Sequence, residues 1–341
     1  LVSANRCQLG HFHRGMIKIA EATPVAELPP IIARTCWRDK WHALAAVSVA
    51  VERAAGIDAK IPQHAIYWRA FCCELERLKN HHEFLISWLH IAGQFAMAKK
   101  HVVISRLLDV LEKFFFDDAT RTPFIVPGGV THDPIAKGKV TRPAIDEALR
   151  AYERAFANDG LVDRGFFDSF AGVGKVSKAD ALRAGLTGPA LRASGVPYDA
   201  RADFPQGAYK QGLLRWDTCV GVEGDVQARV ELHAHEMVQS IRLMYQLGEL
   251  LAETPVSEAS RVDIPNINAG AEGFAVVESA RGELHAYVKA SKDPGKLATL
   301  RIVTPSFLNF TALEQVAGSA AIRKMPYIVH SINPCWACID Q

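Results

Sequence analysis

Two cysteines three positions apart, Cys335 and Cys338, stand near the end of the 341-residue sequence. This spacing lets one turn of backbone point both sulfurs toward a single metal ion. A Cys-x-x-Cys pair alone also fits a redox dithiol or half of a zinc site, so it needs further ligands from elsewhere. The segment 34–42, which contains Cys36, is the first place to look for them.

Three other groups of residues are weaker candidates for a functional site. His11, His13 and Arg14 are expected to bind an anionic group or line a site, or else to lie in a loop with exposed basic residues. Glu74 and His81 fit either a site or a helix face that is solvated or salt-bridged to another helix. His233 falls on an apolar stripe, which favours a satisfied core histidine.

The composition is 49% hydrophobic and 22% charged, with a formal net charge of +2. These values predict a soluble protein with a large core, and they give no reason to expect nucleic acid as a partner. Seven cysteines at irregular spacing argue against a secreted disulfide framework and favour a reducing, cytoplasmic-side compartment. The longest apolar run, 84–98, is too short to span a bilayer, so any membrane link is expected to go through partner subunits.

Apolar periodicity sets the elements that must position the thiols. Strands are expected at 275–277, 284–289 and 297–303. Helices are expected over 40–56, 63–116 (with Gly93 as the weak point), 142–159 after a Thr141 cap, 221–254, and, more briefly, 177–184 and 311–318. The expected fold class is α+β, mainly α: a long-helix bundle with a small β region and extensive loops, forming a single domain with a helical core over 40–254 and a β-containing part over 270–341.

Taken together, several segments resemble the large subunit of nickel–iron hydrogenases, in the membrane-bound, energy-converting branch that shares its fold with the quinone-site subunit of respiratory complex I. They follow the family's order over nearly the whole chain. The matching residues are Gly10 to Gly15, Arg34-Thr35-Cys36, His42 to Ala45 with Val51-Glu52, Glu74 to Arg77, Gly172 to Gly174, Gly185 to Pro189, Leu191 to Gly195, Gly224-Asp225 with Arg229, Glu236 and Ser240, Glu278 to Glu283, Thr304 to Phe307 with Asn309, and Pro334 to Cys338.

In the hydrogenase branch, the resemblance implies four thiolates that hold nickel and bridge to iron. This chain keeps three of them, Cys36, Cys335 and Cys338, and has Asp39 at the fourth position. A carboxylate is a hard ligand that binds a metal terminally but cannot copy a bridging thiolate. The resemblance also implies that Arg281 hangs over the metal site. We expect Arg281 and His42 to be catalytic, and His13 and Arg14 to bind a cofactor.

The favoured function is that of a subunit in a membrane-associated oxidoreductase complex, peripheral on the cytoplasmic side. It would take part in electron transfer or coupling beside an iron–sulfur small subunit carrying a 4Fe-4S cluster, with membrane subunits as further partners, and without a complete nickel–iron centre. Three alternatives stay open: an active nickel–iron hydrogenase that oxidises or evolves H2, quinone reduction as in complex I, and a purely structural site for zinc or iron. The first residue is Leu rather than Met, so a segment upstream is expected to be missing.

Overall fold

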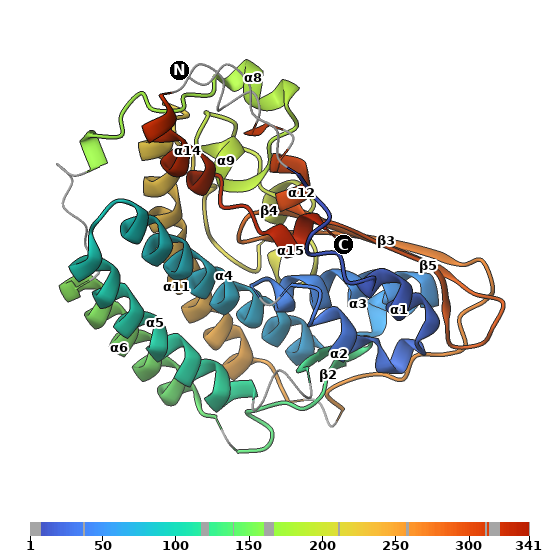
Figure 1. Ribbon diagram of the computed structural model, residues 1–341. Helices are drawn as coiled ribbons and strands as arrows, with labels where there is room; N and C mark the ends of the chain where they lie inside the picture. Colours follow the sequence, from blue (N-terminus) through green and yellow to red (C-terminus); the bar gives the residue numbers. More distant parts are fainter. Residues whose placement is uncertain are drawn as a thin grey trace.

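The computed structural model describes residues 8–36, 38–116, 123–138, 140–159, 167–210, 212–256, 259–310, 312–313 and 321–340. Five long helices dominate these parts of the chain (Figure 1). They are α3 (Lys40–Ala55), α4 (Gln63–Ile91), α5 (Phe95–Phe116), α6 (Arg142–Asp159) and α11 (Val226–Glu253). The expectation of a mainly helical α+β fold is therefore confirmed.

Glycines mark two of the helix ends. Gly56 follows α3 in the left-handed region, at φ 66°, and closes the helix as a C-terminal cap. Gly93, at φ 76°, lies in the short break between α4 and α5. The long helical region expected over 63–116 is thus two helices, divided at its predicted weak point.

The long helices form a bundle around α4. This helix packs against α3, α5 and α11, and α6 packs against α5 and α11 (Figure 1). Aromatic side chains fill the junction of α4 and α5, where the ring of Trp68 meets those of Phe71 and Phe115 at centroid distances of 5.5 and 6.1 Å. Their burial supplies much of the hydrophobic stabilisation of this end of the bundle.

The larger sheet is antiparallel, with the order β3 (Glu272–Ser279), β4 (Gly282–Ala290) and β5 (Leu297–Val303). Ser279 pairs with Gly282, so Ala280 and Arg281 alone make the turn between β3 and β4. Helix α3 packs against β3 and β4 and joins the sheet to the bundle. A small hairpin of β1 (Ile125–Val126) and β2 (Gly129–Val130) is separate from this sheet.

The remaining elements are short. The helix expected at 177–184 is α8 (Lys178–Arg183), capped by the Ser177 side chain. The helix expected at 311–318 lies outside the described residues except for positions 312 and 313. The other elements are α1 (Met16–Ala22), η1 (Val25–Glu27), α2 (Leu28–Ile32), η2 (Asp58–Lys60), α9 (Gly188–Arg192), α10 (Ala200–Asp203), η3 (Gly207–Tyr209), α12 (Pro305–Phe310), η4 (Ile322–Lys324), α14 (Met325–Ser331) and α15 (Trp336–Ile339). Among the described helices, none combines the length and the apolar character needed to cross a membrane.

Candidate metal centre

The three cysteines expected to share a site do meet. The Sγ atoms of Cys36 and Cys335 are 3.6 Å apart, and the sulfurs of Cys36, Cys335 and Cys338 all lie within 4.8 Å of one another. All three side chains are buried. Soft thiolates this close together are suited to hold one ion such as zinc or iron.

The segment that follows β5 holds the tail cysteines in place. The Ser306 hydroxyl accepts a hydrogen bond from the backbone N–H of Cys335 at 3.0 Å. The Thr304 hydroxyl donates one to the carbonyl oxygen of Cys338 at 2.7 Å. Both tail thiols are therefore fixed through their backbones, which leaves the sulfurs free to face Cys36.

Glu76 of α4 organises the other side of the site. Its carboxylate accepts hydrogen bonds from two N–H groups in the first turn of α3, those of Trp41 at 3.0 Å and His42 at 2.9 Å. An acidic group at this end of a helix satisfies unpaired donors and complements the helix dipole. Asp39 holds the N-cap position of α3, but its side chain makes no capping bond. Its carboxylate groups instead with His42 and Glu76, whose possible ligand atoms lie within 4.8 Å of one another and of an oxygen of Asp39.

Arg281 reaches this carboxylate from the turn between β3 and β4. Its Nη1 is paired with Oδ2 of Asp39, and both side chains are buried. Within the described part of the chain, Nε and Nη2 of Arg281 are buried without a hydrogen-bond partner. Burial alone would lower the pKa of Arg281, but Asp39 and the three cysteines raise it. The guanidinium is therefore charged, and its Nε and Nη2 groups can still donate hydrogen bonds.

A close approach of two glycines holds the turn that carries Arg281. A Cβ added to Gly188 would lie 2.4 Å from the carbonyl oxygen of Arg281, and one added to Gly282 would lie 2.7 Å from the backbone nitrogen of Gly188. Thr187 adds a hydrogen bond, since its hydroxyl accepts from the N–H of Glu283 at 3.0 Å. The contact between α9 and the hairpin therefore sets where Arg281 points.

Cys335 differs electrostatically from its two neighbours. Hydrogen bonds from the Cys338 and Cys36 thiols, together with the charge of Arg281, lower the pKa of Cys335 well below its usual value despite burial. The pKa values of Cys36 and Cys338 are raised, mainly through their hydrogen bonds to Cys335. The three sulfurs therefore share one negative charge, which faces Arg281.

His42 lies between two carboxylates. Its Nδ1 is 2.7 Å from Glu76 Oε2 and 3.4 Å from Asp39 Oδ1. Burial lowers the pKa of His42, but Asp39 and Glu76 together raise it above its usual value. The pKa of Asp39 is lowered, because Arg281 and His42 outweigh its burial. This arrangement favours a charged imidazole beside Asp39.

The expected cofactor residues His13 and Arg14 lie at the edge of this region and are exposed. The imidazole Nδ1 of His13 is 3.2 Å from the carbonyl oxygen of Asp340, and Arg14 donates to the carbonyl of Thr35 at 2.9 Å. Both residues therefore connect the first described segment to the two cysteine-bearing segments. Their role toward a cofactor stays a prediction.

The donor set can be compared with a nickel–iron centre. Such a centre needs four thiolates, two of them bridging, whereas the described cysteines supply three at this place. The fourth position, Asp39, is a carboxylate, and one of its oxygens is engaged by Arg281. The residues present do not fit a complete nickel–iron centre. They do fit a single ion, which would tie the segment after α2 to the tail.

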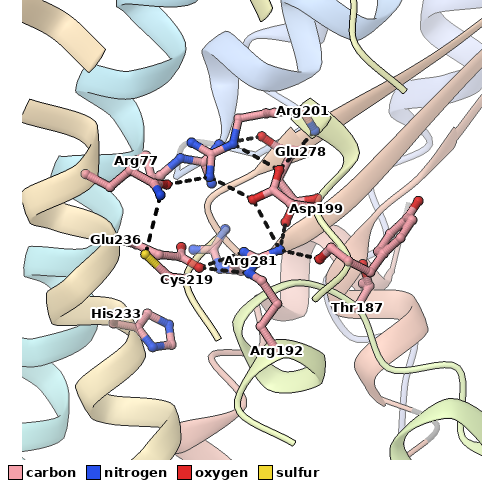
Figure 2. A network of polar contacts seen from close by, with 12 residues as sticks. Arg77, Thr187, Arg192, Asp199, Arg201, Cys219, His233, Glu236, Glu278 and Arg281 are labelled. Carbon is pink, nitrogen blue, oxygen red and sulfur yellow. Dashed lines mark hydrogen bonds and ion pairs between the residues drawn. The ribbon is translucent and has the colours of Figure 1, made fainter. Parts of the chain in front are cut away.

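A buried ionic network lies next to the site (Figure 2). Arg192 of α9 contacts Glu236 of α11 and Glu278 of β3, each at 2.7 Å. From α4, His81 reaches Glu236 at 3.0 Å, and Arg77 donates to the carbonyl of Ser279, two residues before Arg281, at 2.8 Å. The network thus joins the bundle to the strand that leads into the site.

This network corrects one expectation. The face of α4 that carries Glu74, Arg77 and His81 is fully buried, so a solvated face is wrong and the interhelical alternative is confirmed. Arg201 and Arg77 lower the pKa of Glu74 to about 2, although burial opposes this. His233 is a core residue, as predicted, and its ring is stacked on Phe84 at 3.9 Å. It is satisfied only in part, because Nδ1 bonds to a backbone carbonyl whereas Nε2 is buried without a hydrogen-bond partner among the described residues.

Sequence reasoning missed Glu76 and Arg192 as site-building residues. Glu76 stands in a run of charged residues that resembles any solvated helix face. Arg192 follows a glycine and a proline in a stretch with no periodicity. The one available signal was their place inside the segments that resemble the hydrogenase family.

The long-helix bundle and the buried thiol set fit the fold of the hydrogenase and complex I family that the sequence resembles, and comparisons with known proteins agree. The family model described as "Respiratory-chain NADH dehydrogenase, 49 Kd subunit" matches residues 108–269 and 265–341, so the chain belongs to this family. A subunit of the NADH-quinone oxidoreductase of Sinorhizobium medicae is 30% identical, over 98% of this chain and 87% of that protein.

Two further relatives widen the comparison. The carbon monoxide-induced hydrogenase of Rhodospirillum rubrum is 28% identical, over 97% of this chain and 90% of its own length. Among solved structures, a chain of the membrane-bound sulfane sulfur reductase, an archaeal respiratory membrane complex, is 25% identical. It superposes with a TM-score of 0.89 and covers 100% of this chain and 91% of that one. The expected likeness to both the hydrogenase and the complex I branches is confirmed.

Proposed function

We propose that this chain is a peripheral subunit of a membrane-associated oxidoreductase complex and works without a complete nickel–iron centre. It takes part in electron transfer or coupling next to an iron–sulfur subunit that carries a 4Fe-4S cluster, on the cytoplasmic side. The observation that carries the proposal is the fourth ligand position. There, Asp39 is paired with Arg281, whereas the three cysteines group with one another.

The surface beside Cys335 supports docking of the iron–sulfur subunit. A cleft there is lined by Phe12, Ile322, Met325 and Trp336 together with Cys335. Phe12, Ile322 and Trp336 are exposed in the isolated chain. Exposed apolar side chains gathered around one cleft are typical of a protein interface. A cluster bound at this surface would lie close to the shared thiolate.

Metal analysis of the purified complex tests the proposal. We expect nickel far below one atom per chain, with iron accounted for by the clusters of the partner subunits. One nickel per chain would overturn the proposal. If the acceptor is a quinone, as the names of the NADH-quinone oxidoreductase relatives indicate for those proteins, quinone-site inhibitors should stop turnover of the complex.

Hydrogen turnover is the second candidate, favoured by the three sulfurs that lie within reach of one ion. In that case Cys36, Cys335 and Cys338 are ligands, and Asp39 or a water molecule is the fourth. Uptake or evolution of H2 by the isolated complex would support it. No H2 activity in a complex with its full metal load would exclude it.

A further inference from the structure

The outward face of α5 carries a row of apolar side chains. Their spacing of four, three and four residues is that of one seam along a helix. The row consists of Val103, Leu107, Val110 and Phe114, whose side chains are 58%, 37%, 63% and 50% exposed. Four large apolar residues exposed in line are unusual for a surface that faces only water.

A basic row runs beside the apolar one. Lys99, Arg106 and Lys113 are exposed and follow one another at intervals of seven residues. In a heptad with the apolar residues at positions a and d, these three occupy position g. Side chains at g lie next to the seam and select a partner helix by charge.

A different face of α5 is already engaged in the bundle. His101, Ile104, Leu108 and Leu111 are buried there, where α5 packs against α4 and α6. The apolar row is therefore additional to the contacts that hold α5 in place. A helix that serves only this bundle would carry polar residues at these outward positions.

The neighbouring helix shows that ordinary pattern. On α6, the exposed Glu147 pairs with Arg150 and Arg154, at 3.4 and 2.8 Å. The apolar surface is thus one helix wide and has charged side chains next to it. This shape suits a second helix packed along the row, with the basic side chains at its edge to select that helix by charge.

We propose that the outward face of α5 is a docking surface for an amphipathic helix of a partner subunit. That helix presents apolar residues to the row from Val103 to Phe114 and acidic residues to Lys99, Arg106 and Lys113. The inference rests on the proposed function only in that the chain has partner subunits.

Photo-crosslinking in the intact complex tests this proposal. The complex is purified through a tag on this chain, with benzoylphenylalanine replacing Val110 or, as the matched control, the exposed Arg150 of α6. We expect position 110 to form an adduct with one other subunit. Its crosslinked peptide should hold apolar residues three and four apart and nearby Asp or Glu. Position 150 should form no such adduct.

A charge reversal gives a second, independent measurement. Arg106→Glu with Lys113→Glu would place like charges against the acidic partner, so retention of the crosslinked subunit should fall about tenfold or more. Arg150→Glu with Arg154→Glu should leave retention unchanged. Circular dichroism of each purified complex checks that these exposed substitutions leave the fold intact.

The outcomes separate this proposal from the function on which it rests. If other subunits co-purify but position 110 links only to lipid, to a second copy of this chain or to nothing, the docking surface alone is overturned. Unchanged retention after the charge reversal would overturn the acidic partner helix. If no other subunit co-purifies with the unaltered chain, both the docking surface and the proposed function fail.

Discussion

At the scale of residues, Arg281 is the cation that faces the three cysteines, while His42 lies beside Asp39. Arg281 faces both the Asp39 carboxylate and the charge shared by the three sulfurs. Asp39 contacts Arg281 and His42, so it is held as an anion inside the protein. Removing the guanidinium would leave a buried carboxylate and a buried thiolate without their main counter-charge.

The variant Arg281→Met should therefore destabilise the protein by roughly 3–5 kcal/mol, the usual cost of breaking a buried ion pair. Thermal unfolding of the purified complex measures this loss. Adding Asp39→Asn should restore part of it, since the stranded charge is removed. Arg301→Met, on the exposed face of β5, is the matched control. An unfolding midpoint unaffected by Arg281→Met would contradict the assigned role.

The thiol set makes a prediction about zinc. Added Zn2+ should bind one equivalent per chain, because three sulfurs lie within reach of one ion. Cys36→Ser should weaken this binding at least about tenfold. Cys219→Ser, at a cysteine outside this group of three, should leave it unchanged. Titration against a colorimetric chelator measures the zinc affinity of each variant. Equal affinity in the two variants would speak against a site shared by the three cysteines.

At the scale of elements, the sheet joins the bundle where the backbone of β3 packs directly against the backbone of α3. A Cβ added to Gly273 of β3 would lie 1.9 Å from the carbonyl oxygen of Ala50 in α3. The strand can approach the helix backbone this closely only at a glycine. The turn with Arg281 at the end of β3 is thus placed by packing over the whole length of the strand.

Gly273→Ala should accordingly destabilise the protein by about 1–3 kcal/mol or more, because β3 must move away from α3. Gly248→Ala is the control. It lies inside α11, where an added Cβ has its nearest neighbour at 3.4 Å and alanine is the better helix former. Urea unfolding of the two variants should give opposite or clearly unequal shifts. Equal shifts would argue against the packing role of Gly273.

The elements also show what sequence alone can deliver. Periodicity predicted the long helices, although it treated 63–116 as one region with a weak point at Gly93, and family resemblance predicted that Cys36 would meet Cys335. Neither predicted that Glu76 caps α3, because charged residues are normally assigned to the surface. Helices α9 and α10 have five and four residues, too few for a periodic pattern to appear. The contact between α9 and the β3–β4 turn, which positions Arg281, could therefore not be predicted from the sequence.

At the scale of the whole molecule, buried histidines link three helices of the bundle. In α4, Nδ1 of His82 lies 3.2 Å from Nδ1 of His101 in α5, and its Nε2 lies 2.6 Å from the hydroxyl of Tyr152 in α6. All three side chains are buried. Burial lowers the pKa of His101 to about 4, and that of His82 well below its usual value. Both imidazoles are therefore neutral in the folded protein near neutral pH.

Stability should consequently depend on pH in mildly acidic solution. The unfolded chain takes up protons on these histidines below about pH 6.5. In the folded chain, His101 is protonated only near pH 4, and His82 also resists protonation because it is buried. Stability is thus complete above about pH 6.5 and falls as the pH drops, by about 1.4 kcal/mol per unit for each histidine. Urea unfolding from pH 7 to 4.5 should show a shallower slope in His101→Leu. His235→Asn, at an exposed site, should keep the original slope, and identical slopes in all three proteins would refute the assignment.

The sulfur atoms that meet at the site come from cysteines 299 positions apart. During synthesis on the ribosome, Cys36 is therefore made long before Cys335 and Cys338, and it cannot contact them until nearly all of the described residues have been synthesised. An ion captured there would be the last part to arrive, and it would lock a polypeptide that is already folded. We expect loading to follow the emergence of Cys335 and Cys338 from the ribosome, so nascent chains too short to expose these two cysteines should not incorporate a pulse of radioactive zinc at this site.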